Sequence, residues 1–116
     1  MDDVNKVYKV FLYENDNLKN LFRGIEGSRN IEYDKWLKAK KVMSVDGSGQ
    51  KPYLTGIHCL KNKKDAIEYL KNFRTEKNRV VVECYASGLR KKPTNEKVSL
   101  ADFIYVPSVE EIKIVA

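Results

Sequence analysis

The alternation of hydrophobic and polar residues is clearest over residues 56–90, where it predicts a strand, a helix and a second strand. Residues 56–60 form a short apolar run with β propensity. Residues 63–74 carry apolar side chains at helical spacing, and Asn62 stands where the N-cap of that helix is expected. Residues 79–87 alternate between two faces and are rich in β-branched residues. A strand–helix–strand unit is therefore expected at the centre of the fold.

The segments on either side of this unit predict mostly strands. Residues 5–13 and 18–23 alternate on both sides of a turn, so residues 5–23 are expected to form a β-hairpin. Residues 31–45 fit either a helix capped by Asp34 or a strand entered by a turn at Tyr33-Asp34, and we favour the short turn followed by the strand. The remaining expected elements are strands at 98–106 and 112–115 and loops at 46–52 and 88–97. This pattern predicts one α+β domain over residues 1–116, with a curved, mostly antiparallel sheet of about six strands and one main helix packed on one face.

The positive charge of the protein is concentrated in the middle of the chain. The whole sequence has 22 Lys and Arg against 16 Asp and Glu, a net charge of +6. Residues 35–97 carry sixteen basic and six acidic residues, a net charge of +10, whereas each flanking segment has a net charge of −2. This distribution favours an anionic partner such as a nucleotide, a nucleic acid or an acidic protein, and it fits a lysine-rich solvated surface equally well.

Metal binding and covalent catalysis find little support in the sequence. The chain has one histidine, His58, and two cysteines, Cys59 and Cys84, with none of the spacings typical of zinc sites, so we expect no metal and no cofactor. His58 and Cys59 are adjacent on a predicted strand and therefore face opposite sides, which prevents a direct dyad. We expect a protein that is not an enzyme. Both cysteines are expected to be buried thiols, with a disulfide between them as the alternative.

A short basic stretch is the best candidate ligand site. Arg90, Lys91 and Lys92 are consecutive cations suited to phosphates, and Asn95 is suited to the edge of a base. The other residues assigned to this candidate site are Arg23, Lys51, Tyr53 and His58. An aromatic ring such as that of Tyr53 would stack on the base. A solvated hairpin tip explains the same run of cations equally well.

Several short motifs resemble those of small proteins encoded by phages and prophages. These motifs are Tyr8-Lys9-Val10-Phe11, Leu21-Phe22, Trp36-Leu37-Lys38-Ala39, Gly56-Ile57-His58-Cys59, Asp65-Ala66, Tyr69-Leu70, Gly88-Leu89-Arg90 and Leu100-Ala101-Asp102. Many such proteins have no assigned activity, and some of similar size, including the Thoeris anti-defence and anti-CBASS proteins, sequester nucleotide signals of bacterial immunity. The resemblance implies a viral anti-defence protein that binds a cyclic nucleotide immune signal, of the cyclic oligonucleotide or cyclic ADP-ribose type, without cleaving it.

The expected partners and location follow from this hypothesis. A tightly held nucleotide favours a pocket closed by a second subunit, so a homo-oligomer is expected. The first residues are acidic and no window of the sequence is apolar enough to span a membrane, so we expect a protein of the host cell cytoplasm without a membrane partner. Two alternative functions stay open: a protein-binding inhibitor of a host defence enzyme and a basic nucleic-acid-binding protein.

Overall fold

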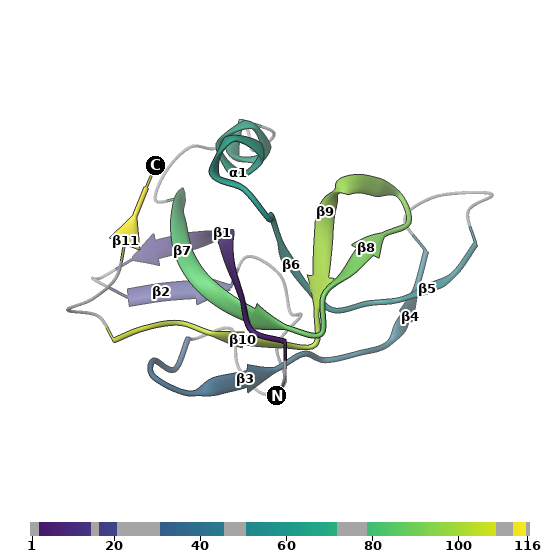
Figure 1. Ribbon diagram of the computed structural model, residues 1–116, viewed down its shortest axis with the longest axis horizontal. Helices are drawn as coiled ribbons and strands as arrows, with labels where there is room; N and C mark the ends of the chain where they lie inside the picture. The colour runs from purple at the N-terminus through teal and green to yellow at the C-terminus, as the bar shows by residue number, and fades with distance from the viewer. Residues whose placement is uncertain are drawn as a thin grey trace.

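The computed structural model contains one α-helix and eleven β-strands within the residues that it describes (Figure 1). Described are residues 3–14, 17–20, 31–45, 51–71, 79–108 and 113–115, with the backbone alone for residues 20 and 113. The strands are β1 (Asn5–Glu14), β2 (Asn17–Asn20), β3 (Trp36–Lys38), β4 (Met43–Ser44), β5 (Tyr53–Leu54), β6 (Ile57–Cys59), β7 (Arg79–Ser87), β8 (Arg90–Lys92), β9 (Asn95–Ala101), β10 (Phe103–Tyr105) and β11 (Lys113–Ile114), and the helix is α1 (Lys63–Leu70).

The largest sheet is built on the long antiparallel pair β1 and β7. Its strand order is β2-β1-β7-β10-β3, and β11 pairs with β7 on the same edge as β10, nearer the start of β7. Both long strands are buried on two sides because their alternate residues enter different hydrophobic clusters. Val7 and Phe11 belong to the cluster inside the curled sheet, whereas Val10 belongs to the cluster beneath α1. The strong curvature of β7 is visible in Figure 1.

A second sheet, of order β6-β9-β8, adjoins the first. It is joined to β1 by two backbone hydrogen bonds, each of 2.8 Å, between Tyr8 and Leu60. It is also continuous with β10, because β9 and β10 are separated only by Asp102. The strands β4 and β5 form a separate two-stranded sheet, which extends to one end of the molecule (Figure 1).

Helix α1 begins where the sequence predicts. The side-chain oxygen of Asn62 accepts a hydrogen bond from the backbone N–H of Asp65 at 2.8 Å, and the Asn62 amide donates to the Asp65 carboxylate at 3.0 Å. This reciprocal pair satisfies an amide that the first turn leaves without a helical partner. Ala66 is fully buried against Val10 and Val81, so the helix covers the outer face of β1 and β7. Across the described residues, no helix has the length and apolarity needed to cross a membrane.

The expected α+β fold with one helix on a curved antiparallel sheet is confirmed. The predicted hairpin is present as β1 and β2, while residues 21–23 lie outside the described part. In the ambiguous segment the strand is correct, as β3, and it follows a bend in which Asp34 has a φ of 60°. Residues 46–50 of the predicted loop and 72–74 of the predicted helix also lie outside the described part.

Two boundaries near the end of the chain were predicted wrongly. The expected loop at 88–97 is the hairpin of β8 and β9. The expected strand at 98–106 starts earlier, at Asn95, and is interrupted at Asp102, where the chain passes from one sheet to the other. The pattern concealed both features because the exposed residues at the hairpin tip are Pro93 and polar side chains, a composition typical of a loop, and a change of sheet leaves the alternation almost intact.

Candidate functional site

The three consecutive cations at residues 90–92 do not converge on one point. They form β8, and successive side chains of a strand point to opposite faces. Lys91 is exposed, whereas Arg90 and Lys92 are half-buried, and a register shift in the pairing with β9 falls between Lys91 and Lys92. A loop would have allowed the three charges to surround one phosphate, and the strand prevents this.

Arg90 is committed to partners within the protein. Its guanidinium donates to the backbone oxygens of Leu54 at 2.8 Å and Thr55 at 2.9 Å, and to the Asp102 carboxylate at 3.2 Å. Asp102 also pairs with Lys41 at 3.4 Å. The planar guanidinium thus connects β5, β8 and the bend between β9 and β10. This geometry gives Arg90 a structural role.

The other sequence candidates are dispersed. Tyr53 is buried, with 8% of its surface exposed, so its ring has little area available for a base. Lys51 is exposed just before β5, and His58 is half-buried in the middle of β6. Arg23 lies outside the described residues. Of the seven candidates within the described residues, only Asn95 lines the pocket described next.

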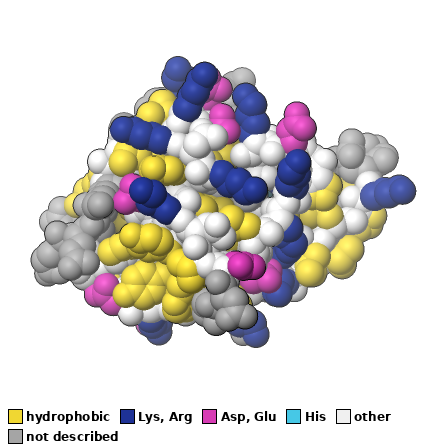
Figure 2. Space-filling view, in the orientation of Figure 1, with side chains coloured by type: hydrophobic (Ala, Val, Ile, Leu, Met, Phe, Trp, Pro, Cys, Tyr) yellow, Lys and Arg dark blue, Asp and Glu magenta, His cyan; other side chains and the backbone are white. Residues whose placement is uncertain are grey.

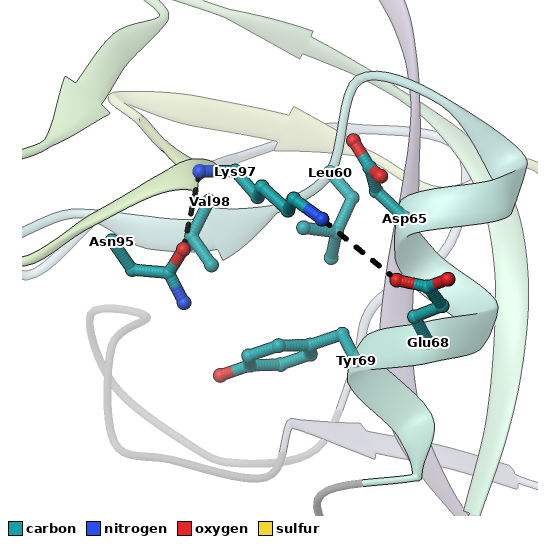
Figure 3. A pocket seen from close by; sticks show the side chains of 7 residues that line it. All are labelled: Leu60, Asp65, Glu68, Tyr69, Asn95, Lys97 and Val98. Atoms are coloured by element: carbon teal, nitrogen blue, oxygen red, sulfur yellow. Dashed lines mark hydrogen bonds and ion pairs between the residues drawn. The ribbon is translucent and has the colours of Figure 1, made fainter.

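A pocket of about 210 Å³ lies between α1 and β9. Its lining residues are Leu60, Asp65, Glu68, Tyr69, Asn95, Lys97 and Val98. The buried side chains of Leu60 and Val98 form its apolar base, while Asn95 and Lys97 are exposed at its rim. Figure 3 shows Tyr69 extending from α1 toward Asn95 and Lys97 extending from β9 toward Glu68, so that two elements frame one hollow.

Hydrogen bonds and ion pairs hold the polar groups of the pocket. The side-chain oxygen of Asn95 accepts from the backbone N–H of Lys97 at 3.1 Å, so the Asn95 amide nitrogen remains as the donor end of that side chain. The Lys97 ammonium lies 3.8 Å from the Glu68 carboxylate. The Asp65 carboxylate accepts from Asn62, as part of the helix cap. The pocket therefore presents an amide donor, two carboxylates, an ammonium and an aromatic ring.

Positive charge surrounds the pocket on the surface. Exposed lysines occupy the start of α1 at residues 61, 63 and 64 and the hairpin tip at residues 91 and 97. Figure 2 shows Lys and Arg side chains spread over the face that carries α1, β8 and β9, with few Asp and Glu side chains among them. Part of the positive charge carried by the middle of the sequence therefore lies on this face.

A second polar feature lies in the core and not at the surface. Lys9, 3% exposed, donates from its ammonium to the backbone oxygen of His58 at 2.8 Å and lies 5.5 Å from the centre of the Phe11 ring. Burial lowers the pKa of Lys9 from 10.5 to about 8. Burial raises the pKa of the Cys59 thiol from 9.0 to about 11 and that of Cys84 further still. Both cysteines are free, buried thiols, as expected.

Neither a metal-binding cluster among the described residues nor a known relative points to a function for this protein. Within the described part of the chain, no three His, Cys, Asp or Glu side chains gather as a metal site would require. Comparisons with protein-family models, with curated proteins and with solved structures found no match for this chain.

Sequence reasoning missed the aromatic and charged walls of the pocket. Glu68 and Tyr69 follow Asp65 by three and four residues, which places both beside Asp65 on the helix surface. That spacing was a usable signal for a shared surface. No signal in the sequence indicated that β9 lies against the helix, because Asn95 and Lys97 come from a hairpin that the sequence pattern predicted as a loop.

Proposed function

We propose that this protein binds a small anionic nucleotide in the pocket between α1 and β9 and holds it without cleaving it. The observation that supports this function is the meeting, in one hollow, of an aromatic ring, an amide, two carboxylates and an ammonium. These groups match the parts of a nucleotide: the ring can stack on a base, the amide can bond the base edge, a carboxylate can accept from ribose hydroxyls, and the cation can pair with phosphate.

The pocket is too small to enclose a whole nucleotide. Pockets for drug-sized molecules have volumes of about 300–1,000 Å³, and this pocket, of about 210 Å³, is smaller. It has room for a base and part of a ribose, whereas the phosphates would lie outside at the rim. Lys97 is at that rim, and the exposed Lys61 directly follows Leu60 of the pocket base.

The ion pair across the pocket does not obstruct a phosphate. Lys97 and Glu68 are 3.8 Å apart, and their side chains are 64% and 51% exposed. Exposed pairs of this kind contribute about 0–1 kcal/mol, so exchanging Glu68 for a phosphate oxygen costs Lys97 little. The freed Glu68 carboxylate would then be available to a ribose hydroxyl.

The proposal that the ligand is captured and not converted rests on the resemblance to phage proteins that sequester nucleotide signals. The resemblance to phage proteins suggests a cyclic nucleotide immune signal as the ligand, whose removal from solution opposes host defence. Because the rim is open, a second subunit placed over it would slow release, and we include a homo-oligomer in the proposal.

The direct test is isothermal titration with cyclic dinucleotides, cyclic trinucleotides and cyclic ADP-ribose isomers. We expect one member of this panel to bind and to be recovered intact, by mass spectrometry, after the protein is denatured. The absence of heat with every member far above micromolar concentration contradicts nucleotide binding. Recovery of a cleaved product contradicts capture without cleavage.

Asn95→Asp is the sharpest variant for the pocket. It keeps an oxygen that can accept from the Lys97 N–H but replaces the amide donor with a negative charge, so we expect at least a tenfold loss of affinity. Lys91→Ala is the matched control, because Lys91 is exposed on the neighbouring strand β8 and does not line the pocket. Equal affinity of the wild type and Asn95→Asp would show that the ligand binds elsewhere.

A further inference from the structure

The two-stranded sheet of β4 and β5 exposes an unusual number of large apolar side chains. Seven large hydrophobic residues are exposed in the described part of the chain, and four of them belong to this unit. They are Val42, Met43, Val45 and Leu54, with exposed fractions from 42% to 63%. Figure 2 shows the corresponding hydrophobic area at the end of the molecule where Figure 1 places β4 and β5. Clustered exposure of this kind marks an interaction surface more often than scattered exposure does.

The backbone of β4 has an open edge. The backbone groups of Val42 point toward Thr55, since the Thr55 N–H donates to the Val42 oxygen at 2.8 Å and the Val42 N–H donates to the Thr55 hydroxyl at 3.0 Å. Along an antiparallel ladder, residue pairs whose backbone groups face each other alternate with pairs whose backbone groups face outward. Met43 and Leu54 form the next pair, so the N–H and C=O groups of each point away from the partner strand. On the β5 side the outward oxygen of Leu54 accepts from Arg90. Among the described residues, β4 pairs with no strand other than β5. The outward N–H and C=O of Met43 are therefore available to a further strand.

The positive charge around this edge favours a binding partner that carries negative charge. Exposed lysines stand at positions 38, 40 and 51, while Lys41 pairs with Asp102, and the sequence has no Asp or Glu from Trp36 to Val45 or from Lys51 to Leu54. A second copy of the chain would bring lysines against lysines, which opposes self-association through this edge. Carboxylates complement the surface, and apolar side chains complement Met43, Val45 and Leu54.

We propose that β4 is the docking edge for an extended segment of an acidic partner protein. The segment adds as a strand beside β4, bonds the outward backbone groups of Met43, and lays alternate apolar side chains on the exposed face. Its intervening carboxylates reach the lysines on either side. This site is separate from the α1–β9 pocket and does not depend on the proposed nucleotide function.

The test is selection from a displayed library of short, fully randomised linear peptides on the immobilised full-length protein. We expect enrichment of peptides that alternate apolar and acidic residues, and titration of the enriched peptide gives its affinity. Val45→Glu should weaken that peptide at least tenfold, because it adds a negative charge to the apolar face. Val4→Glu is the matched control, since Val4 is 52% exposed, Val45 is 48% exposed, and Val4 lies outside the β4–β5 unit.

Met43→Pro tests the backbone part of the proposal. The outward N–H of Met43 makes no bond to β5, so its removal should leave the fold intact while weakening the peptide. Thermal unfolding checks the fold of each variant. Enrichment of basic peptides, no enrichment, or equal loss with Val4→Glu would overturn the proposal. Self-association that Val45→Glu abolishes would assign the edge to a second copy and would also overturn it.

Discussion

Replacing the buried Lys9 with methionine should make the protein more stable at neutral pH. Lys9 is almost fully buried, and its ammonium has one hydrogen-bond acceptor among the described residues, the backbone oxygen of His58. Desolvation is the main cause that lowers its pKa from 10.5 to about 8, so the folded state disfavours the charged form. Methionine keeps an unbranched chain of similar length and carries no charge.

The magnitude follows from the change in pKa. A shift from 10.5 to about 8 corresponds to a penalty of about 3 kcal/mol on the charged form. Lys9→Met removes this penalty but leaves the His58 oxygen without its donor, at a cost of about 2 kcal/mol. We therefore expect the free energy of unfolding at pH 7 to rise by about 1 kcal/mol.

The same reasoning predicts a reversal at high pH. Below about pH 8 the amine is protonated in both states, so the penalty is constant. Between about pH 8 and 10.5 the unfolded chain binds more protons, so the stability of the wild type increases with pH. The variant lacks this increase and should become the less stable protein, by about 2 kcal/mol near pH 10.5.

Urea unfolding of both proteins between pH 7 and 10.5 measures the difference directly. The thiol of Cys59 contributes with the opposite sign above pH 9, since its folded pKa is raised to about 11, but both proteins contain it, so it largely cancels. Lys6→Met is the matched control, because Lys6 is on the same strand with a 56% exposed side chain, and we expect a change below about 1 kcal/mol. A difference between the wild type and Lys9→Met that stays constant over this pH range would refute the reasoning.

Three further predictions concern stability and reactivity. Gly88→Ala should lower the free energy of unfolding by at least about 1 kcal/mol in urea titration, because φ is +71° and a Cβ atom would lie 2.5 Å from the Asp102 carboxylate; an unchanged midpoint would contradict this. Arg90→Lys should cost about 1–3 kcal/mol, because an ammonium cannot span the acceptors on β5 and Asp102, and wild-type stability would remove its structural role. Cys84 should react with a thiol reagent at pH 8 only as fast as the protein unfolds, because burial raises the pKa of its thiol; rapid reaction of the native protein would show that it is accessible.

The sequence by itself determined the elements whose bonds and periodicity are local. The Asn62 cap lies three residues from its partner Asp65, so the start of α1 could be predicted from the chain. The long strands β1 and β7 span enough residues for their alternation to show two buried faces. One helix over a curved antiparallel sheet followed from these elements.

Only the tertiary structure decided which side chains meet. The strands β4 and β5 have two residues each and show no periodicity, so neither their pairing nor the open edge was predictable. Arg90 was expected to face a phosphate, yet carbonyl oxygens far away in the sequence bind its guanidinium. The pocket joins Tyr69 of the helix to Asn95 of a distant hairpin. Such contacts depend on how helices and strands pack together in three dimensions, and the spacing of residues along the chain does not predict that packing.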